Sequence, residues 1–141
     1  VAISGGIKQI EQAQELAKEL GARMAILLEV SGAFHSSFMK GATQKLANEL
    51  EKIKINAPKI PVICNVTGKQ ASSTAEIKEN LIKQVASSVL WEDSMKLMLS
   101  KGIKNFIEFG PGKVLKGLIR RIDAQAQVVN IEKKEDILVL Q

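Results

Sequence analysis

Short apolar runs of strand length alternate along this chain with longer segments in which apolar side chains recur at helical spacing. The apolar runs cover residues 1–4, 24–30, 62–66, 103–109 and 127–131. The segments of helical periodicity cover residues 7–20, 37–53, 74–85, 91–99 and 113–122, and a terminal helix is expected within 132–141. This alternation predicts an α/β protein with a largely parallel sheet, in which the run 24–30 is a strand covered on both faces.

Residues that commonly begin or end helices stand at several of these boundaries. Gly21 and Gly102 each follow a helical segment, where a glycine often ends the helix. Ser73 or Thr74 can cap the N-terminus of the helix expected over 74–85.

The chain of 141 residues is long enough for one domain with a hydrophobic core and too short for two full ones. No apolar run approaches the roughly 20 residues of a membrane-spanning helix. The opening residues resemble a strand entered part-way through a protein rather than a signal peptide. The single cysteine, Cys64, excludes an intramolecular disulfide and a multi-cysteine zinc site. A reducing, cytoplasmic setting without membrane association is the simplest interpretation.

The formal net charge is +5, from 20 Lys and Arg against 15 Asp and Glu. Such an excess is compatible with nucleic acid, a membrane surface or an acidic protein as partner. Aromatic residues make up only 4% of the chain, and no cluster of Lys and Arg is interleaved with them. Because single-stranded nucleic acids stack on aromatic side chains, a nucleic-acid partner is disfavoured.

The only histidine, His35, lies in the small-residue turn between the run 24–30 and the following helix. Such turns are where α/β proteins place working side chains, and a neutral imidazole can act as a general base. A lone histidine with no visible partner is more often a packed or capping side chain. The residues of this turn leave both interpretations open.

A general base needs a nucleophile, and the local candidates are Ser36, Ser37 and Cys64. None of them lies in a Gly-x-Ser-x-Gly elbow. The two serines are better explained as helix N-cap residues, and Cys64 lies within an apolar run where a thiol is buried and unreactive. No second histidine or carboxylate pair accompanies His35, so a complete catalytic triad cannot be assembled from this sequence.

A second candidate site is the turn Gly110-Pro111-Gly112-Lys113, which joins an expected strand to an expected helix. Helix N-termini bind phosphate, but this turn matches neither the dinucleotide-binding nor the phosphate-loop pattern. Lys113, Lys116 and Arg120 share one face of the helix, which is either a solvated face or a docking surface for an acidic partner.

Asn65, at the end of an apolar run, is a weaker candidate for a site residue. An alternative function is therefore a non-catalytic α/β module that binds a phosphate-containing ligand or an acidic protein.

Four separated blocks of sequence stand out when they are taken together. They are Val30-Ser31-Gly32-Ala33-Phe34-His35-Ser36; Asn56-Ala57-Pro58 with Pro61-Val62-Ile63-Cys64-Asn65-Val66; Ile82-Lys83-Gln84-Val85 with Val89-Leu90-Trp91; and Glu108-Phe109-Gly110-Pro111-Gly112-Lys113-Val114-Leu115. In this order the blocks resemble the C-terminal half of malonyl-CoA:acyl carrier protein transacylases, the acyltransferases of fatty-acid synthesis. The resemblance covers essentially the whole chain.

The resemblance implies transfer of a malonyl group from coenzyme A, through a seryl ester, to the phosphopantetheine thiol of acyl carrier protein. In this family the histidine that pairs with the serine matches His35, and a main-chain carbonyl at the position of Gln84 orients its ring. Phe34 matches the Ala-Phe-His pattern associated with malonyl selection, since a bulky ring fills the space that an α-methyl group would need. Malonyl-CoA is then the substrate and acyl carrier protein the partner, with no permanently bound cofactor and no metal.

By the same resemblance, residues 1–34 are the remainder of a ferredoxin-like small subdomain, and residues 35–141 are the C-terminal part of a hydrolase-like acyltransferase subdomain. The nucleophilic serine, the arginine that binds the malonyl carboxylate and the oxyanion loop belong to the family's N-terminal half. They have no counterpart in this sequence, because Arg23, Arg120 and Arg121 do not lie in the arginine's motif. This chain alone is expected to be inactive, since a base without nucleophile and oxyanion donors stabilises the transition state little.

Overall fold

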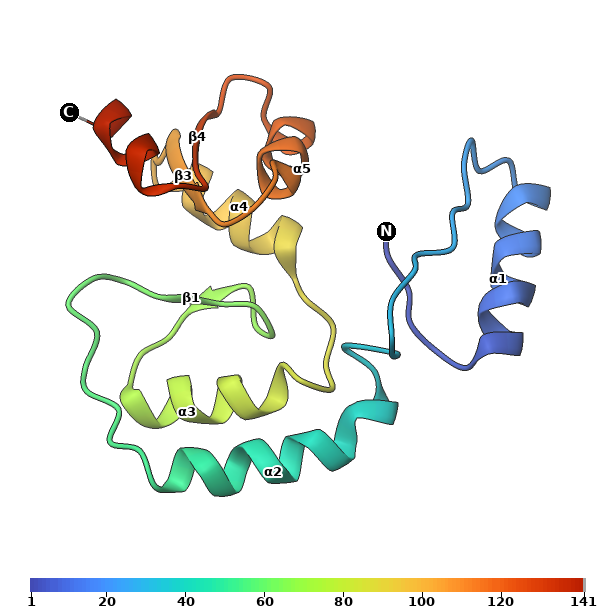
Figure 1. Ribbon diagram of the computed structural model, residues 1–141, viewed down its shortest axis with the longest axis horizontal. Coiled ribbons are helices and arrows are strands. Elements are labelled where there is room, and N and C mark those ends of the chain that lie inside the picture. The colour runs from blue at the N-terminus through green and yellow to red at the C-terminus, as the bar shows by residue number, and fades with distance from the viewer. Residues whose placement is uncertain (141) are drawn as a thin grey trace. The chain divides into compact units, whose positions relative to one another are not determined.

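The structure, a computed structural model, describes residues 1–140 and divides into two compact units, Val1–Val89 and the remainder from Leu90 onward. Both units contain helices and strands (Figure 1). The first unit contains α1 (Ile7–Glu19), the 3₁₀ helix η1 (Ser37–Met39), α2 (Lys40–Glu51), β1 (Ile63–Cys64), β2 (Lys69–Gln70) and α3 (Thr74–Lys83). The second unit contains α4 (Trp91–Ser100), β3 (Asn105–Phe109), α5 (Val114–Ile122), β4 (Gln127–Ile131) and the 3₁₀ helix η2 (Lys134–Leu140).

The second unit is a β-α-β arrangement with a closed apolar core. β3 and β4 pair in parallel, from Asn105 opposite Gln127 to Phe109 opposite Ile131, and α5 connects them. The core consists of Met95, Ile119, Ala126 and Val128, with Trp91, Met98, Phe106 and Ile122 packed around it. The parallel pairing and the helix predicted for this part of the chain are confirmed, although the terminal segment forms a 3₁₀ helix.

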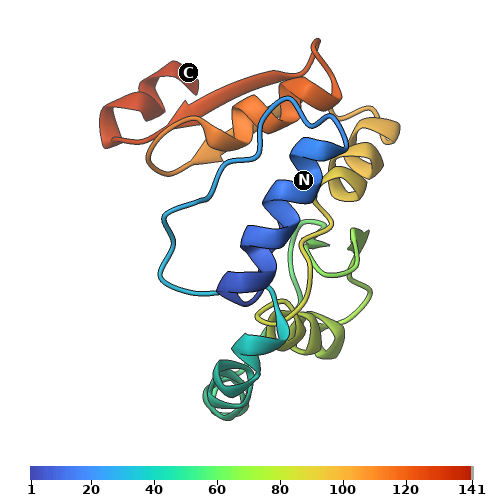
Figure 2. The same cartoon turned by 90° about the vertical axis from the view of Figure 1, so that its right-hand side faces the viewer.

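The first unit is built from two packed helices and a short hairpin. α2 packs against α3, and α3 packs against β1 (Figures 1 and 2). β1 and β2 pair antiparallel, with Ile63 opposite Gln70 and Cys64 opposite Lys69. Cys64 is a free, buried cysteine, as predicted. The single helix expected over 37–53 is η1 followed by α2.

Two predicted strands are wrong, because residues 1–4 and 24–30 form no strand in this structure. A strand depends on hydrogen bonds to a neighbouring strand, and none of the described residues pairs with either segment. The side chains of Met24 and Ile26 are consequently 78% and 68% exposed. The helix between the two segments does form, and Gly21 follows it with a φ of 86°.

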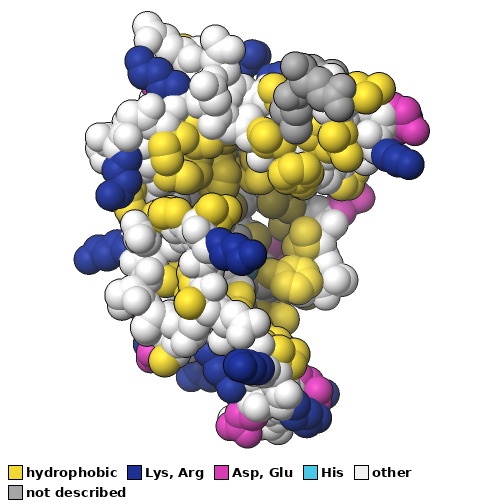
Figure 3. Space-filling view, turned by 90° about the vertical axis from the view of Figure 1, so that its left-hand side faces the viewer, with side chains coloured by type: hydrophobic (Ala, Val, Ile, Leu, Met, Phe, Trp, Pro, Cys, Tyr) yellow, Lys and Arg dark blue, Asp and Glu magenta, His cyan; other side chains and the backbone are white. Residues whose placement is uncertain are grey.

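Large apolar side chains are exposed in both units. Figure 3 shows hydrophobic side chains gathered on one face of the structure. Leu27 and Leu28 are each 63% exposed in the first unit, and Phe109 is 72% exposed in the second. Within residues 1–140, the helices fall short of the length and apolar character that a membrane crossing requires.

Candidate functional site

The ring of His35 is held by a long-range hydrogen bond inside the first unit. Its Nδ1 lies 2.8 Å from the main-chain carbonyl oxygen of Gln84. A carbonyl oxygen only accepts hydrogen bonds, so Nδ1 carries a hydrogen and donates the hydrogen bond. In the neutral ring this leaves the lone pair on Nε2, which can then accept a proton from a reacting group. His35 is exposed, so the residue is accessible within this unit.

The backbone of His35 is unusual. Its φ of 58° makes it the only non-glycine residue with a positive φ in the part of the chain that the structure describes. Histidine tolerates this left-handed conformation better than most residues, but it still costs about 1–2 kcal/mol. Such conformations persist only where neighbouring contacts hold them, and they concentrate at functional sites.

Ser36 supplies the contacts that hold this turn. Its Oγ donates a hydrogen bond to the carbonyl oxygen of Ala33 at 2.6 Å and accepts one from the backbone N–H of Phe38 at 3.3 Å. Ser36 is therefore the N-cap of η1, as predicted. Because both interactions use its hydroxyl, the side chain serves the turn rather than standing free as a nucleophile.

Gln84 lies at the end of α3 and uses its backbone and its side chain separately. It is the C-cap of the helix, so its carbonyl is among those that have no partner within the helix. That carbonyl accepts from His35, while the side-chain Oε1 accepts from Asn65 Nδ2 at 3.2 Å. Asn65 directly follows β1. Three segments far apart in the sequence thus converge on Gln84 and His35.

The other predicted residues form no hydrogen bond with His35 among the described residues. Phe34, beside His35, is 46% exposed and is not part of the described core. Among the hydrogen bonds of the described residues, none joins His35 to Ser37 or Cys64. Lys113 is the N-cap of α5, and Lys116 and Arg120 lie four residues apart within that helix.

The helix N-terminus that follows the turn Gly110–Lys113 is capped by a carboxylate of the protein itself. Glu108 is only 7% exposed, and its two carboxylate oxygens accept from the backbone N–H groups of Leu115 and Lys116 at 2.9 and 3.0 Å. These first-turn N–H groups of α5 are the ones that a phosphate at the helix N-terminus would use. The phosphate-binding alternative therefore loses its main support.

No pattern in the sequence around Glu108 predicted its capping role. Asn130 reinforces the turn, because its Nδ2 donates to the main-chain carbonyls of Glu108 and Gly110 at 3.3 Å each. A carboxylate that caps from the preceding strand has no fixed offset from the helix that it caps. The one sequence signal was the position of Glu108 in an apolar strand, since a carboxylate that is buried there needs a hydrogen-bond or ionic partner.

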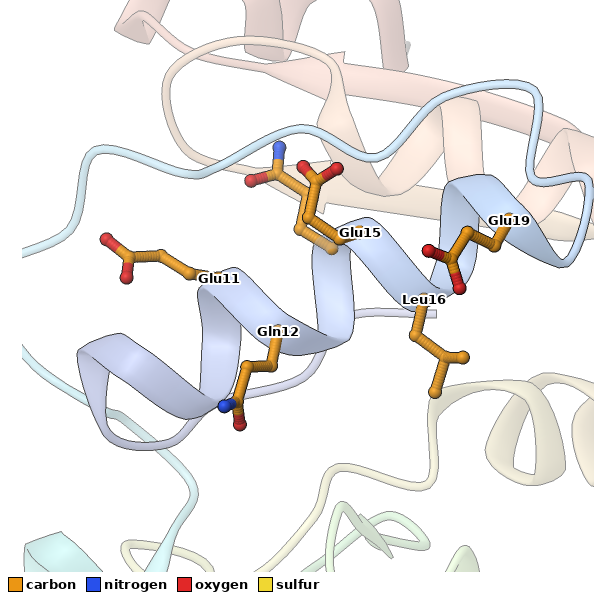
Figure 4. Close-up of a pocket in the computed structure, with 6 residues that line it drawn as sticks. Glu11, Gln12, Glu15, Leu16 and Glu19 are labelled. Atoms are coloured by element: carbon orange, nitrogen blue, oxygen red, sulfur yellow. The ribbon is translucent and has the colours of Figure 1, made fainter.

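A separate open pocket lies on α1. It is lined by Glu11, Gln12, Gln14, Glu15, Leu16 and Glu19 (Figure 4). It contains none of the residues around His35. Across residues 1–140, no group of three or more His, Cys, Asp and Glu side chains is arranged to hold a metal ion.

Known proteins similar to this chain were found by sequence and by structure, although no family model matches it. The malonyl CoA-acyl carrier protein transacylase of Bacillus subtilis (strain 168) is 44% identical over 137 residues, which is 97% of this chain and 43% of that protein. A solved acyl-carrier-protein S-malonyltransferase from Burkholderia pseudomallei 1710b is 38% identical with a TM-score of 0.89, covering 96% of this chain and 44% of that one. A malonyl-transacylase solved in complex with its type II PKS acyl-carrier protein is 32% identical with the same TM-score of 0.89, over 96% of this chain and 44% of that one.

In sequence and in fold, the chain is thus similar to one part of a class of acyltransferases. The relatives that it matches are malonyl-CoA:acyl carrier protein transacylases, and the resemblance based on the four sequence blocks is confirmed. The chain spans less than half the length of these relatives, about 43% of the Bacillus subtilis protein.

Proposed function

We propose that this chain carries the general base of a malonyl-CoA:acyl carrier protein transacylase acting in cytoplasmic fatty-acid synthesis. The supporting observation is the hydrogen bond from His35 Nδ1 to the carbonyl oxygen of Gln84, at 2.8 Å, in a chain similar to such enzymes. A neutral acceptor in place of a carboxylate still fixes the ring and leaves Nε2 as the base.

In the proposed reaction His35 moves one proton in each half. Nε2 takes the proton of a serine hydroxyl while the serine oxygen attacks the thioester carbonyl of malonyl-CoA. As the carbon–sulfur bond then breaks, Nε2 gives that proton to the departing thiolate sulfur of coenzyme A. The phosphopantetheine thiol of acyl carrier protein then gives its proton to Nε2 as its sulfur attacks the seryl ester, and the serine leaves with that proton. The serine would belong to the portion of the relatives that this chain does not match.

The proposed role of Gln84 is to stabilise the charged ring that forms during each half-reaction. Its carbonyl lies at the C-terminal end of α3, where the helix dipole favours positive charge. This position explains how a backbone carbonyl can replace the carboxylate of a catalytic triad.

We assign the remaining predicted residues to recognition. Phe34, next to the base in sequence, is proposed to narrow the space beside the acyl group. Lys113, Lys116 and Arg120 are proposed to dock the acidic carrier protein. We also propose that residues 1–34 are the remainder of a ferredoxin-like small subdomain and that residues 35–141 are the C-terminal part of a hydrolase-like acyltransferase subdomain.

The test uses a reconstituted enzyme, in which this chain is joined to the part of the Bacillus subtilis relative that lies outside the match. Transfer of labelled malonyl from coenzyme A to acyl carrier protein is measured, together with the seryl ester on the enzyme. We expect His35→Ala to slow ester formation by at least about 100-fold, since that is the usual contribution of a general base. The circular dichroism spectrum should stay unchanged. A variant that transfers malonyl at the parental rate would exclude His35 as the base.

A further inference from the structure

We infer that Asn65 is a positioning residue for His35, acting through the side chain of Gln84. This inference rests on the proposed function of His35 as a general base. Two hydrogen bonds meet on Gln84: Asn65 Nδ2 donates to its Oε1 at 3.2 Å, and His35 Nδ1 donates to its main-chain oxygen at 2.8 Å. A restraint on the side chain of Gln84 therefore limits the movement of the carbonyl that orients the ring.

The carbonyl of Gln84 needs such a restraint because of where it lies. α3 ends at Lys83, and the chain then leaves the helix in a turn closed by the hydrogen bond from Ala86 N–H to the Lys83 carbonyl at 3.2 Å. The last residues of a helix fray more readily than its middle. The backbone N–H of Gln84 donates to the carbonyl oxygen of Asn80, but the carbonyl oxygen of Gln84 accepts no hydrogen bond from within the helix.

Asn65 is well placed to restrain this helix end because it belongs to a turn that is closed by backbone hydrogen bonds. It follows β1, and the backbone N–H groups of Thr67 and Gly68 both bond to the carbonyl of Cys64, at 3.3 and 2.9 Å. β1 also packs against α3. The side chain of Asn65 thus ties the hairpin turn to the end of α3, across 19 positions of sequence.

The tie is a hydrogen bond between two side-chain amides. In the structure Asn65 Nδ2 donates to Gln84 Oε1. A carboxylate at position 65 could still be bonded, because the Gln84 amide also carries a donor, Nε2, which reaches it when the amide rotates. Asn65→Ala is the informative variant, since it removes the interaction without adding charge.

The first experiment uses the whole 141-residue chain. Because His35 is its only histidine, ¹⁵N-histidine NMR reports one imidazole without ambiguity. At alkaline pH, where the ring is neutral, we expect the Nδ1–H tautomer to dominate in the parental chain and its share to fall in Asn65→Ala. An unchanged tautomer ratio in Asn65→Ala would overturn the inference, since a purely structural role of Asn65 would not move this signal.

The matched control is a second Asn–Gln pair in the same unit. On α2, Gln44 Nε2 donates to Asn48 Oδ1 at 2.9 Å, and both residues are exposed. Asn48→Ala removes an amide hydrogen bond of the same kind and should leave the tautomer ratio of His35 unchanged.

The second experiment measures kinetics in the reconstituted enzyme. Asn65→Ala should lower kcat about tenfold, because small misplacement of a catalytic group is costly, while KM for malonyl-CoA stays the same. Gln84→Ala keeps the main-chain carbonyl but loses Oε1, so it should cause a similar loss, and the double variant should be no slower than either single one. Additive losses, or a raised KM at constant kcat, would overturn the inference.

The two proposals fail in different ways. If His35→Ala retains transfer, the proposed function is wrong. If His35→Ala is inactive while Asn65→Ala keeps the parental kcat and tautomer ratio, only the positioning role is wrong.

Discussion

His35 combines a left-handed backbone with a ring hydrogen bond to a helix-terminal carbonyl. The φ of 58° is unfavourable by itself, and the hydroxyl of Ser36 holds the turn from both sides. The distance of 2.8 Å from Nδ1 to Gln84 then fixes which ring nitrogen can accept a proton. Backbone and side chain are thus restrained independently, which is the preorganisation that proton transfer needs.

Phe34 is open to a test of substrate selection. The residue is 46% exposed, so Phe34→Ser should change the stability of the folded chain little. In the reconstituted enzyme we expect the ratio of kcat/KM for methylmalonyl-CoA to that for malonyl-CoA to rise about tenfold. One methyl group in a tight pocket changes the discrimination between two substrates by about that factor or more.

The control for this prediction is Phe38→Ser. Phe38 lies on η1 and is 70% exposed. The Phe38→Ser substitution should leave the ratio of the two kcat/KM values unchanged. Competition between the two thioesters measures the ratio directly. An unchanged ratio in Phe34→Ser would reduce Phe34 to a packing residue.

At the scale of elements, α3 is the helix on which the candidate site depends. Its N-terminus carries a reciprocal cap. Ser73, one of the two cap residues that the sequence predicted, accepts at Oγ from Glu76 N–H at 3.1 Å. Glu76 Oε2 accepts from the hydroxyl and N–H of Ser72 at 2.6 and 2.7 Å. Its C-terminus presents the Gln84 carbonyl to His35. The helix is therefore capped at its N-terminal end by its own residues, and its C-cap residue Gln84 is hydrogen-bonded to His35 and Asn65.

The cap of α3 should depend on pH. The hydrogen bonds from the Ser72 side chain and backbone lower the pKa of Glu76 from its ordinary value of 4.5. A lowered pKa in the folded state means that the cap stabilises fully above pH 4.5 and loses its contribution as pH falls through the lowered pKa. Hydrogen exchange of the first-turn amides of α3 should accelerate in that range beyond the intrinsic pH effect.

Glu76→Gln should remove this pH response, because its side chain does not titrate. Glu79→Gln, at an exposed position of the same helix that pairs with Lys83, should retain it. Equal pH responses in the wild-type chain and in Glu76→Gln would contradict the proposed cap.

At the scale of the whole molecule, the two units differ in how much apolar surface they enclose. The second unit closes a core around Met95 and Ile119, which are 4% and 3% exposed. In the first unit, the helices α1 and α2 contain no buried residue, and the large apolar side chains of the run 24–30 are exposed. Exposed apolar patches of this kind mark surfaces that fit a partner.

The 141-residue chain alone should transfer no malonyl group above background. No serine elbow occurs in its sequence, and a base without a nucleophile and oxyanion donors provides little acceleration. The measurement is transfer of labelled malonyl to acyl carrier protein by the isolated chain, with the reconstituted enzyme as positive control. Turnover by the isolated chain that disappears in His35→Ala would contradict the prediction.

Local patterns in the sequence determined most of the helices and the second unit. The helical spacing before Gly21 and within α5 depends on contacts between near neighbours, which the order of residues encodes directly. The apolar runs that became β3 and β4 were predicted as strands from their length and composition, and they pair across 22 positions of sequence. The family resemblance also came from the sequence, because its four blocks retain their order. The acceptor at Gln84 came from that resemblance rather than from any spacing.

Tertiary structure decided what local patterns do not contain. The run 24–30 has the composition of a buried strand, but a strand needs a partner, and the described residues supply none. The hydrogen bond from His35 spans 49 positions, and Glu108 reaches N–H groups seven and eight residues ahead. Each of these contacts exists only where the folded chain brings distant groups together. The sequence by itself therefore determined which residue types were present for the chemistry, and the fold decided which atoms meet.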